Sequence, residues 1–308
     1  MKILHCCLAN FYIDGYGYQK NILPKMHKLP GHEVMILAST ETFINNKSLG
    51  YLQPSNYINE NGIPVHRIPY IKYLPKRLIR KLRIYINTFN EIESFLPDII
   101  FLHDIQFLDI ISIKKYLLKY PQTKLFADGH ADFSNSARNF ISKYILHSII
   151  YRYCAFVIIP FVQCFYGTLP ARVDFFINMY KTPREKTKLL VMGADDELVK
   201  ATKTNLSCDK IRQLFNIKDS DFLLVTGGKI DSSKIQTLNL MRAIQSISIK
   251  NIRMIIFGSI IPELEVEFKK LCDGQKIQFV GWIQSDQSYN YFEAADLIIF
   301  PGRHSVLY

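Results

Sequence analysis

Short apolar, β-prone runs alternate with longer helical patterns along the whole chain, and this alternation constrains the fold more than any other feature. In the first half, the runs expected to form strands are residues 3–8, 33–38, 65–68, 98–102, 124–127 and 155–159. Apolar residues at helical spacing occur in residues 18–29, 76–95, 105–118, 136–150 and 173–180. Such alternation is typical of a parallel sheet that helices cover on both faces.

A second alternating series follows the polar segment 193–207, which we interpret as an interdomain linker. Its expected strands are residues 222–226, 253–258, 276–280 and 297–300, and its expected helices are residues 233–246, 263–271 and 287–294. A chain of 308 residues is long enough for about two domains. We therefore predict two Rossmann-like α/β domains, residues 1–193 and 194–308. Their ligands should lie at the carboxyl ends of the strands, in the cleft that the domains face.

Charge and cysteine content narrow the class of protein. Hydrophobic residues make up 48% of the chain and charged residues 21%, as in folded soluble proteins. The formal net charge of +11 points to an anionic partner, such as a phosphate-bearing substrate, a nucleic acid or acidic lipid headgroups. Six cysteines without a C-x-x-C pair indicate free thiols in a reducing cytosol. Because the first apolar run is too short for a secretory signal, we expect a cytoplasmic protein.

A glycine–lysine sequence follows the first expected strand of the second domain. Gly227, Gly228 and Lys229 come directly after it, and Lys234 precedes the next helical pattern. Glycine backbone amides and a helix start favour an anion, and the two lysines add positive charge. Neither a P-loop nor a G-x-G-x-x-G fingerprint is present. We interpret the sequence as a diphosphate site, and a tight turn with solvated lysines is the alternative.

A second glycine pair, Gly15 and Gly17, follows the first strand of the chain and opens a helix. Their backbone amides are placed to meet a phosphate from the other side of the cleft. A lone G-x-G is weak evidence, and an ordinary turn is the alternative.

Residues 72–83 form a basic segment that has no acidic residue. Leu74, Leu78, Leu82 and Tyr85 share one face if the segment is a helix. The positive charges belong to Lys72, Lys76, Arg77, Arg80, Lys81 and Arg83. We expect this basic segment to rest on an anionic membrane surface, where each cation contributes ~1 kcal/mol, and a solvated helix face is the alternative. Nucleic acid is disfavoured, because the aromatic residues are spread through the expected strands and helices rather than interleaved with the basic segment, and no binding motif is present.

Polar residues follow two expected strands of the first domain. His103 and Asp104 follow one strand, and Asp128, His130 and Asp132 follow the next. We expect no metal site, because no further ligand cluster has suitable spacing. His130 is assigned to a sugar hydroxyl, with a satisfied loop histidine as the alternative, and His103 and Asp104 are expected to be structural.

Several short motifs, in order along the chain, resemble the family 4 glycosyltransferases, which are retaining nucleotide-sugar enzymes of GT-B architecture. They are Gly31-His32-Glu33-Val34, Pro97-Asp98-Ile99-Ile100 with His103, the segment 188–195, Gly228-Lys229 with Lys234, Phe279-Val280-Gly281-Trp282, and the segment 291–301. The resemblance implies a nucleotide-sugar donor, a growing glycan or lipid-linked acceptor, and glycosyl transfer with retention. It also implies that no cofactor or divalent metal is needed, and it suggests an enzyme at the inner face of the membrane.

The resemblance also implies roles for individual residues. Lys229 and Lys234 would neutralise the departing diphosphate, with a backbone amide from Gly15 or Gly17. His130 would touch the donor sugar as the catalytic residue. The remaining donor contacts fall on Gly228, on the base-bordering residues Gly281, Trp282 and Ile283, and on His304 and Ser305.

The sequence departs from the family's pattern in two ways. Lys229 stands where many relatives have arginine, which keeps the charge and loses the bidentate fork. The family also places a glutamate pair on the helix that would follow Tyr308, and the sequence contains neither residue. We therefore expect an incomplete second domain, in a truncated form that is unstable there and inactive. A catalytically silent nucleotide- or glycan-binding module, or another GT-B enzyme such as a nucleotide-sugar epimerase, is the alternative.

Overall fold

The computed structural model describes residues 1–44, 48–204, 207–230 and 235–301. The chain divides into two compact units, Met1–Met192 and Gly193–Tyr308. We describe each unit by itself.

Unit 1 is built on an eight-stranded sheet in the order β10-β9-β8-β7-β1-β2-β6-β5. All neighbouring strands run parallel except β5, which is antiparallel to β6. The strands are β1 (Lys2–Cys7), β2 (Glu33–Ser39), β5 (Ser55–Ile58), β6 (Pro64–Ile68), β7 (Ile99–His103), β8 (Lys124–Gly129), β9 (Val162–Gly167) and β10 (Thr187–Leu189). The remaining strands, β3 (Glu41–Ile44) and β4 (Ser48–Tyr51), form a separate ribbon.

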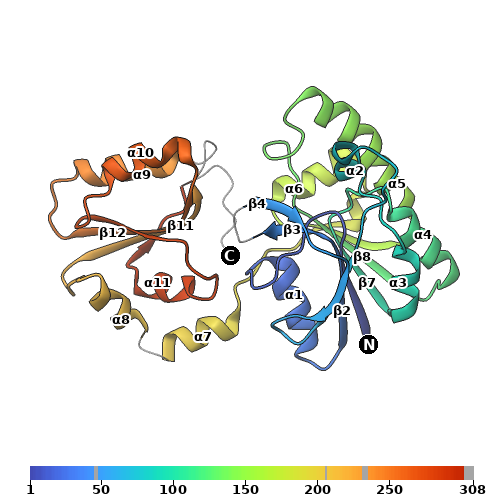
Figure 1. The fold of residues 1–308 in the computed structure, drawn as a ribbon, viewed down its shortest axis with the longest axis horizontal. Helices are drawn as coiled ribbons and strands as arrows, with labels where there is room; N and C mark the ends of the chain where they lie inside the picture. Colours follow the sequence, from blue (N-terminus) through green and yellow to red (C-terminus); the bar gives the residue numbers. More distant parts are fainter. Residues whose placement is uncertain (45–47, 205–206, 231–234, 302–308) are drawn as a thin grey trace. The chain divides into compact units, whose positions relative to one another are not determined.

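Helices cover both faces of this sheet (Figure 1). On one face, α1 (Gln19–Lys28) packs against β1 and β2. The other face carries α3 (Thr88–Phe95), α4 (Ile110–Lys119) and α5 (Arg152–Ile158). Side chains of β1 alternate between the two cores, with Leu4 on the α4 side and Ile3 on the other. His5 therefore points toward the α1 face.

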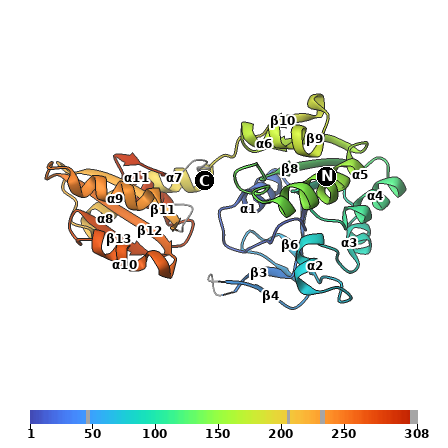
Figure 2. The same cartoon turned by 90° about the horizontal axis from the view of Figure 1, so that it is seen from above.

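Unit 1 contains further helical segments. They are α2 (Lys76–Leu82), a π-helix (Ile141–Tyr151), α6 (Pro170–Phe175) with a π-turn (Phe176–Tyr180), and a 3-10 turn (Arg184–Lys186). The β3–β4 ribbon lies beside α2 (Figure 2), where Nε of Arg80 is 2.8 Å from the Glu41 carboxylate of β3. No helix within the described ranges is both long and apolar enough to cross a membrane.

Two predictions for unit 1 are wrong. Residues 155–159 lie in and just after helix α5, and the strand that follows is β9. A short apolar run does not distinguish a strand from a buried helix, and here both sides of the helix are apolar. Residues 76–95 form two helices, because Arg83 (φ 54°) and Asn87 (φ 66°) adopt left-handed backbone conformations between them. Tyr85 lies in an isolated bridge with Tyr70, outside the helical face to which the sequence assigned it.

Unit 2 has a four-stranded parallel sheet in the order β13-β12-β11-β14. Its strands are β11 (Phe222–Ile230), β12 (Ile252–Ile260), β13 (Ile277–Gly281) and β14 (Leu297–Ile298). One face is covered by α9 (Gln236–Ser246) and α10 (Pro262–Leu271), the other by α8 (Ser207–Leu214) and α11 (Ser288–Ala294) (Figure 1). The helix expected after residue 300 falls outside the described residues.

The segment 193–207 is not a simple linker. It contains α7 (Asp196–Thr204), whose start is capped by Asp195, since Oδ1 of Asp195 accepts the backbone N–H of Glu197 at 3.1 Å. The polar composition that suggested a linker is therefore that of a capped surface helix.

Candidate functional site

The carboxyl ends of β1, β7 and β8 meet at one edge of the unit 1 sheet, and polar side chains gather there. His103 ends β7 and Asp128 lies in β8, with Nδ1 of His103 2.9 Å from Oδ2 of Asp128. The second carboxylate oxygen of Asp128 accepts the backbone N–H of Asp104 at 3.1 Å. Both side chains are buried. Parallel α/β sheets bind their ligands at this end of the strands.

Asp104 connects the carboxyl ends of β1, β7 and β8 through hydrogen bonds. Its backbone is left-handed (φ 68°), which turns its carboxylate toward the neighbouring loops. Oδ1 accepts the backbone N–H of His130 at 3.0 Å, and Oδ2 accepts the side-chain amide of Asn10, which follows β1. Asn10, Asp104, Asp128 and His130 therefore form, with His103, one polar network. The sequence analysis assigned no role to Asn10.

His130 sits at the rim of the polar network with a 28% exposed side chain. Its Nε2 lies 3.7 Å from Oδ1 of Asp128, and its Nδ1 lies 3.5 Å from an Nη of Arg172. Because Arg172 only donates, Nδ1 accepts and Nε2 carries the proton toward Asp128. Both ring nitrogens thus face protein groups, which suits His130 for orienting a ligand more than for exchanging protons with one.

Two carboxylates of the site remain ionised in spite of their surroundings. Burial opposes ionisation of Asp128, but the charge and hydrogen bond of His103, then the charge of His130 and the Asp104 N–H, lower its pKa below the usual range. Burial also opposes ionisation of Asp132, and bonds from Ser134 and the Asn135 N–H lower its pKa overall. Both carboxylates are therefore ionised at neutral pH.

Lys20 supplies a cation to the same edge. Its Nζ donates to the backbone carbonyl of Phe11 and lies over the Phe11 ring, 4.8 Å from the centroid. Burial lowers the pKa of Lys20, and the nearby charges of Cys7, Asp104 and Asp128 oppose that shift. Ionised carboxylates, a cation and amide donors on one edge are the groups that bind a polyhydroxylated ligand. In the described part of the chain, no cluster of three His, Cys, Asp or Glu is arranged to hold a metal.

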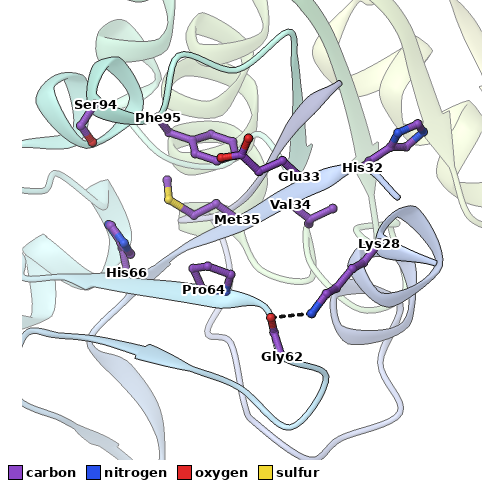
Figure 3. A pocket seen from close by; sticks show the side chains of 10 residues that line it. All are labelled: Lys28, His32, Glu33, Val34, Met35, Gly62, Pro64, His66, Ser94 and Phe95. Atoms are coloured by element: carbon purple, nitrogen blue, oxygen red, sulfur yellow. Dashed lines mark hydrogen bonds between the residues drawn. The ribbon is translucent and has the colours of Figure 1, made fainter. Parts of the chain in front are cut away.

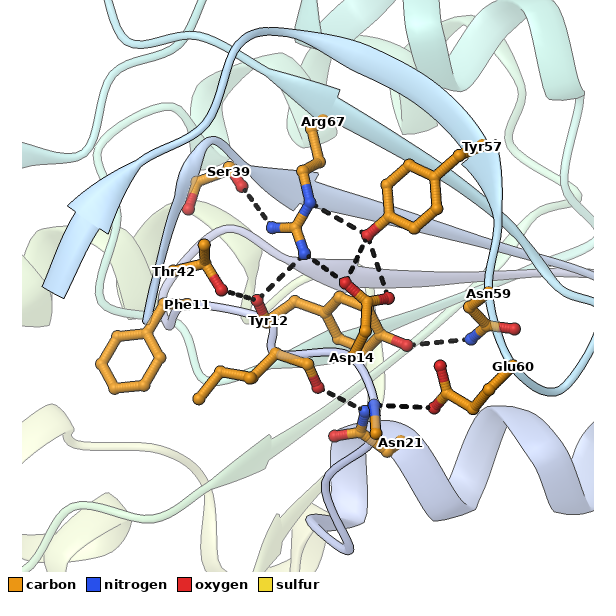
Figure 4. A network of polar contacts seen from close by, with 12 residues as sticks. Phe11, Tyr12, Asp14, Asn21, Ser39, Thr42, Tyr57, Asn59, Glu60 and Arg67 are labelled. Atoms are coloured by element: carbon orange, nitrogen blue, oxygen red, sulfur yellow. Dashed lines mark hydrogen bonds and ion pairs between the residues drawn. The ribbon is translucent and has the colours of Figure 1, made fainter. Parts of the chain in front are cut away.

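The loop between β1 and α1 carries Gly15 and Gly17. Gly15 is left-handed (φ 72°), and its N–H donates to Oε1 of Glu60 at 3.1 Å. Asp14, directly before it, is held by the buried guanidinium of Arg67 at 3.0 Å and by the Tyr57 hydroxyl at 2.7 Å (Figure 4). The expected anion-binding loop is thus fastened to β5 and β6.

Arg67 lies at the centre of the hydrogen-bond network that holds this loop against β5 and β6. Its side chain is fully buried in β6 and donates to the carbonyls of Ser39 at 3.0 Å and Tyr12 at 3.2 Å, besides Asp14 (Figure 4). Its Nε donates to the Tyr57 hydroxyl at 3.0 Å. No local pattern in the sequence predicts this network, because its members are far apart along the chain.

The glycine–lysine sequence of unit 2 is not a turn. β11 continues through it to Ile230, and Gly228 pairs with Gly258 of β12. The glycines fit this pairing: a Cβ at Gly227 would lie 2.1 Å from the Phe257 ring, and one at Gly258 would lie 1.9 Å from the Gly228 carbonyl oxygen. Close backbone approach therefore explains the glycines. Lys229 lies on this strand extension, exposed and opposite Ser259.

The other expected donor residues of unit 2 are placed only in part. Gly281 ends β13 in a left-handed conformation (φ 85°), and Trp282 follows with 45% exposure. Ile283 is partly buried against the core under α11. Lys234, His304 and Ser305 lie outside the described residues.

Some cationic side chains of the basic segment have partners within the protein, and others are exposed to solvent. Arg80 pairs with Glu41, and Arg83 donates to the backbone carbonyl of Gln106 at 3.0 Å. Lys72, Arg77 and Lys81 are exposed. Lys76 begins α2, and its side chain is not described.

A surface cavity of about 370 Å³ lies at the other end of the unit 1 strands (Figure 3). Glu33, the first residue of β2, lines it together with Lys28, which donates to the Gly62 carbonyl at 2.6 Å. Because ligands of parallel sheets lie at the carboxyl ends, we do not assign the function to this cavity.

No protein-family model matches the sequence, and no curated protein is significantly similar to it. Solved structures are similar to it at low identity. One is Alr3699/HepE from Anabaena in complex with UDP and glucose, at TM-score 0.59 and 14% identity, covering 97% of this chain and 73% of that one. Another is the catalytic domain of starch synthase IV from Arabidopsis thaliana bound to ADP and acarbose, at TM-score 0.65 and 15% identity, covering 99% and 78%.

A third is WaaG, a glycosyltransferase involved in lipopolysaccharide biosynthesis, at TM-score 0.61 and 14% identity, covering 99% of this chain and 76% of that one. At these identities the likeness establishes the fold alone. The fold of this chain is that of the GT-B glycosyltransferases.

Proposed function

We propose that the chain is a retaining, family 4-type glycosyltransferase that moves a sugar from a nucleotide-sugar to a glycan or lipid-linked acceptor. The observation that carries this proposal is the polar network at the carboxyl edge of the unit 1 sheet. It presents His130 beside the ionised carboxylate of Asp128, in the fold of a protein crystallised with UDP and glucose. Such an edge recognises hydroxyl groups by paired donors and acceptors.

The proposed reaction uses electrostatic stabilisation of the leaving diphosphate as its main device. Lys229 and Lys234 supply the charge, and the loop amides of Gly15 or Gly17 contact the same group. Because cationic side chains neutralise the diphosphate, the proposal requires no divalent metal. The residues proposed to border the nucleoside and donor sugar are Gly228, Gly281, Trp282, Ile283, His304 and Ser305.

Calorimetric titration with UDP and ADP tests the donor site. Lys229→Ala should weaken binding by ~1.5–3 kcal/mol, roughly 10- to 150-fold, because a charge-assisted hydrogen bond is lost. Lys250→Ala is the matched control, since it removes the same charge from an exposed residue before the amino end of β12. Equal affinity of the Lys229→Ala protein and the wild type would refute the site.

A silent nucleotide- or glycan-binding module is the second candidate. The observation that favours it is the engagement of both ring nitrogens of His130 by Asp128 and Arg172. The two functions differ in turnover: the transferase releases the nucleoside diphosphate from a nucleotide-sugar when an acceptor is added, whereas the module binds and releases the intact donor.

We also propose that unit 1 rests on an anionic membrane surface. Besides the basic segment, the structure shows a stripe of exposed apolar side chains along the π-helix and α5. Phe140 is 72%, Ile149 63% and Phe156 71% exposed. The apolar stripe consists of Phe140, Ile141, Tyr144, Ile145, Ile149, Tyr153 and Phe156. Exposed apolar patches of this kind are typical of interaction surfaces.

The charges beside the apolar stripe indicate what covers it. No acidic residue occurs from 133 to 173 or from 61 to 90. The stripe and the basic segment are neighbours, because the Tyr151 hydroxyl donates to the backbone carbonyl of Lys81 at 2.8 Å. An apolar stripe flanked by the exposed cations Lys72, Arg77 and Lys81 matches the interface of an anionic bilayer.

A further inference from the structure

A chain of histidines crosses unit 1 from α1 to the polar network. Nδ1 of His27 in α1 lies 2.9 Å from Nε2 of His5 in β1. Nδ1 of His5 lies 3.0 Å from Nε2 of His103, and Nδ1 of His103 lies 2.9 Å from Asp128. His5, His103 and Asp128 are 0%, 1% and 0% exposed, and His27 alone of the four is partly exposed. We call His27, His5 and His103 the histidine chain.

The end at Asp128 fixes how the protons are arranged. The ionised carboxylate only accepts, so Nδ1 of His103 donates to it. If His103 is neutral, its Nε2 accepts from Nδ1 of His5, and Nε2 of His5 accepts from Nδ1 of His27. Every hydrogen bond then points toward Asp128, and Nε2 of His27 is left with a lone pair at the partly exposed end.

A second arrangement satisfies the same bonds with one more proton. When a proton joins Nε2 of His27, the Nδ1 proton of His27 passes to His5, and the Nδ1 proton of His5 passes to His103. His103 then carries both ring protons and the positive charge, beside Asp128. Each ring gains one proton and His27 and His5 each pass one on, so a single charge moves across the sheet.

We propose that the histidine chain is a proton relay that places the charge of a proton taken up at His27 on His103, and so controls the charge that Asp128 presents to His130. His5 and His103 are then positioning residues of the candidate site. Transfer needs no side-chain rearrangement, because donor and acceptor nitrogens already lie within hydrogen-bond distance.

The surroundings favour His103 as the place where the charge rests. Burial, then the charges of His103 and His27, hold the pKa of His5 well below its usual value. Burial, then the charges of His32 and His103, also lower the pKa of His27. His103 is the member that touches a carboxylate whose pKa is lowered by that contact. The other titratable or charged groups facing the relay and its end are Cys7, Lys20, Asp104, His130 and Arg172.

If the histidine chain were purely structural, its contacts would be the same at one pH, but its response to pH would differ. Its histidines would keep one tautomer, because no proton would pass between them. A relay makes the rings change together, since no ring can switch its hydrogen bonds alone. Nitrogen NMR of histidine-labelled full-length protein separates the two, because the shifts of both ring nitrogens report the tautomer and the charge.

We expect the shifts of His27, His5 and His103 to change with one common midpoint, which lies below the usual pKa of histidine because burial lowers the pKa of His5 and of His27. His66 lies outside the histidine chain, with its Nδ1 2.8 Å from the Glu91 carboxylate, and serves as the internal reference. Constant shifts of His5 and His103 while His27 titrates, or three separate midpoints, would overturn the relay. This measurement needs no variant.

His27→Asn tests the entry point. The amide nitrogen of asparagine replaces Nδ1 as the donor to His5, and the variant has no titratable nitrogen. His5 and His103 should then stay neutral across the range, and the midpoint of His130 should rise because no charge appears on His103. His66→Asn, which removes a histidine that pairs with Glu91 outside the histidine chain, should change neither. An unchanged His130 midpoint in His27→Asn would overturn the coupling.

These measurements read protonation directly and need no substrate. The NMR titration can therefore refute the relay while the Lys229→Ala titration supports the nucleotide site. It can equally support the relay while the nucleotide site is refuted.

Discussion

Gly258→Ala is the sharpest perturbation of unit 2, because it tests whether β11 and β12 stay paired beyond Thr226. The added Cβ would lie 1.9 Å from the carbonyl oxygen of Gly228, 2.7 Å from its carbonyl carbon and 3.0 Å from its nitrogen. These are backbone atoms of the paired strand, so no side chain can move aside. The backbone of Gly258 is also in a region that L residues rarely adopt (φ +127°).

The expected loss of stability has two parts. The unfavourable backbone conformation costs ~1–2 kcal/mol, and pushing the paired strands apart costs ~1–3 kcal/mol. Gly258→Ala should therefore lower the free energy of unfolding of unit 2 by about 2–5 kcal/mol. Gly274→Ala is the matched control for the first part alone, because its φ is +73° and no atom lies within 4 Å of the added Cβ. Gly193→Ala meets open space without a positive φ and should change stability by less than ~0.5 kcal/mol.

Urea unfolding followed by tryptophan fluorescence measures the effect in the right unit. Trp282 is the only tryptophan of the chain and lies in unit 2, directly after β13. At slopes of ~1–3 kcal/mol per M, the midpoint for Gly258→Ala should fall by roughly 1–2 M. If Gly258→Ala shifts the midpoint no more than Gly274→Ala does, the strands are not paired at Gly228 and the glycine turn expected from the sequence is restored.

Three further outcomes are expected. Wild-type protein should pellet with anionic vesicles at low salt and dissociate as the salt concentration rises. The double variant Arg77→Glu, Lys81→Glu should no longer pellet, whereas Lys250→Glu should pellet like the wild type. Unchanged pelleting of the double variant would remove the basic segment from the proposal. Arg67→Met should lower the free energy of unfolding of unit 1 by ~3–5 kcal/mol, because it leaves buried acceptors unpaired. Circular dichroism should detect this loss, while the unfolding transition of Trp282 fluorescence should not move. A loss below ~1 kcal/mol would contradict the network of Figure 4. Burial, then the charges of Arg83 and Lys81, lower the pKa of His147 to about 4. Folding therefore favours the neutral form of His147. Its contribution to the free energy of unfolding is fully present above about pH 6.5, and up to ~3 kcal/mol is lost as the pH drops toward 4. His147→Phe should flatten that acid slope, and an unchanged slope would contradict the assignment.

The sequence predicted the parts of the fold that repeat a local pattern. β1, β2, β7 and β8 appear where β-branched runs predicted them, because each strand is buried on both faces and reads as a continuous apolar run. Residues 155–159 were misassigned for the same reason, since a buried helix reads identically over so short a distance. The extension of β11 through Gly228 was missed because the pairing that requires glycine comes from β12.

The candidate site was predictable only where its residues follow strands directly. His130 and Asp128 were found by that placement, and the structure joins them through Asp104. The histidine chain was not found, because His5 and His103 are separated by 98 positions and meet only when β1 and β7 pair. Likewise, the apolar stripe was not predicted, because exposure is not a property of a local pattern.

The bond between the Gly15 N–H and Glu60 has a consequence for the energetics of ligand capture. That amide already holds a carboxylate, so an incoming anion at Gly15 takes part in an exchange reaction: one negative group leaves as another arrives. The net gain in free energy would be the difference between two charge-assisted hydrogen bonds, less any repulsion that remains between the bound anion and the displaced Glu60 carboxylate. At the proposed anion site, Glu60 would therefore be a competitor within the protein, and the measured affinity of the loop would be lower than its intrinsic affinity.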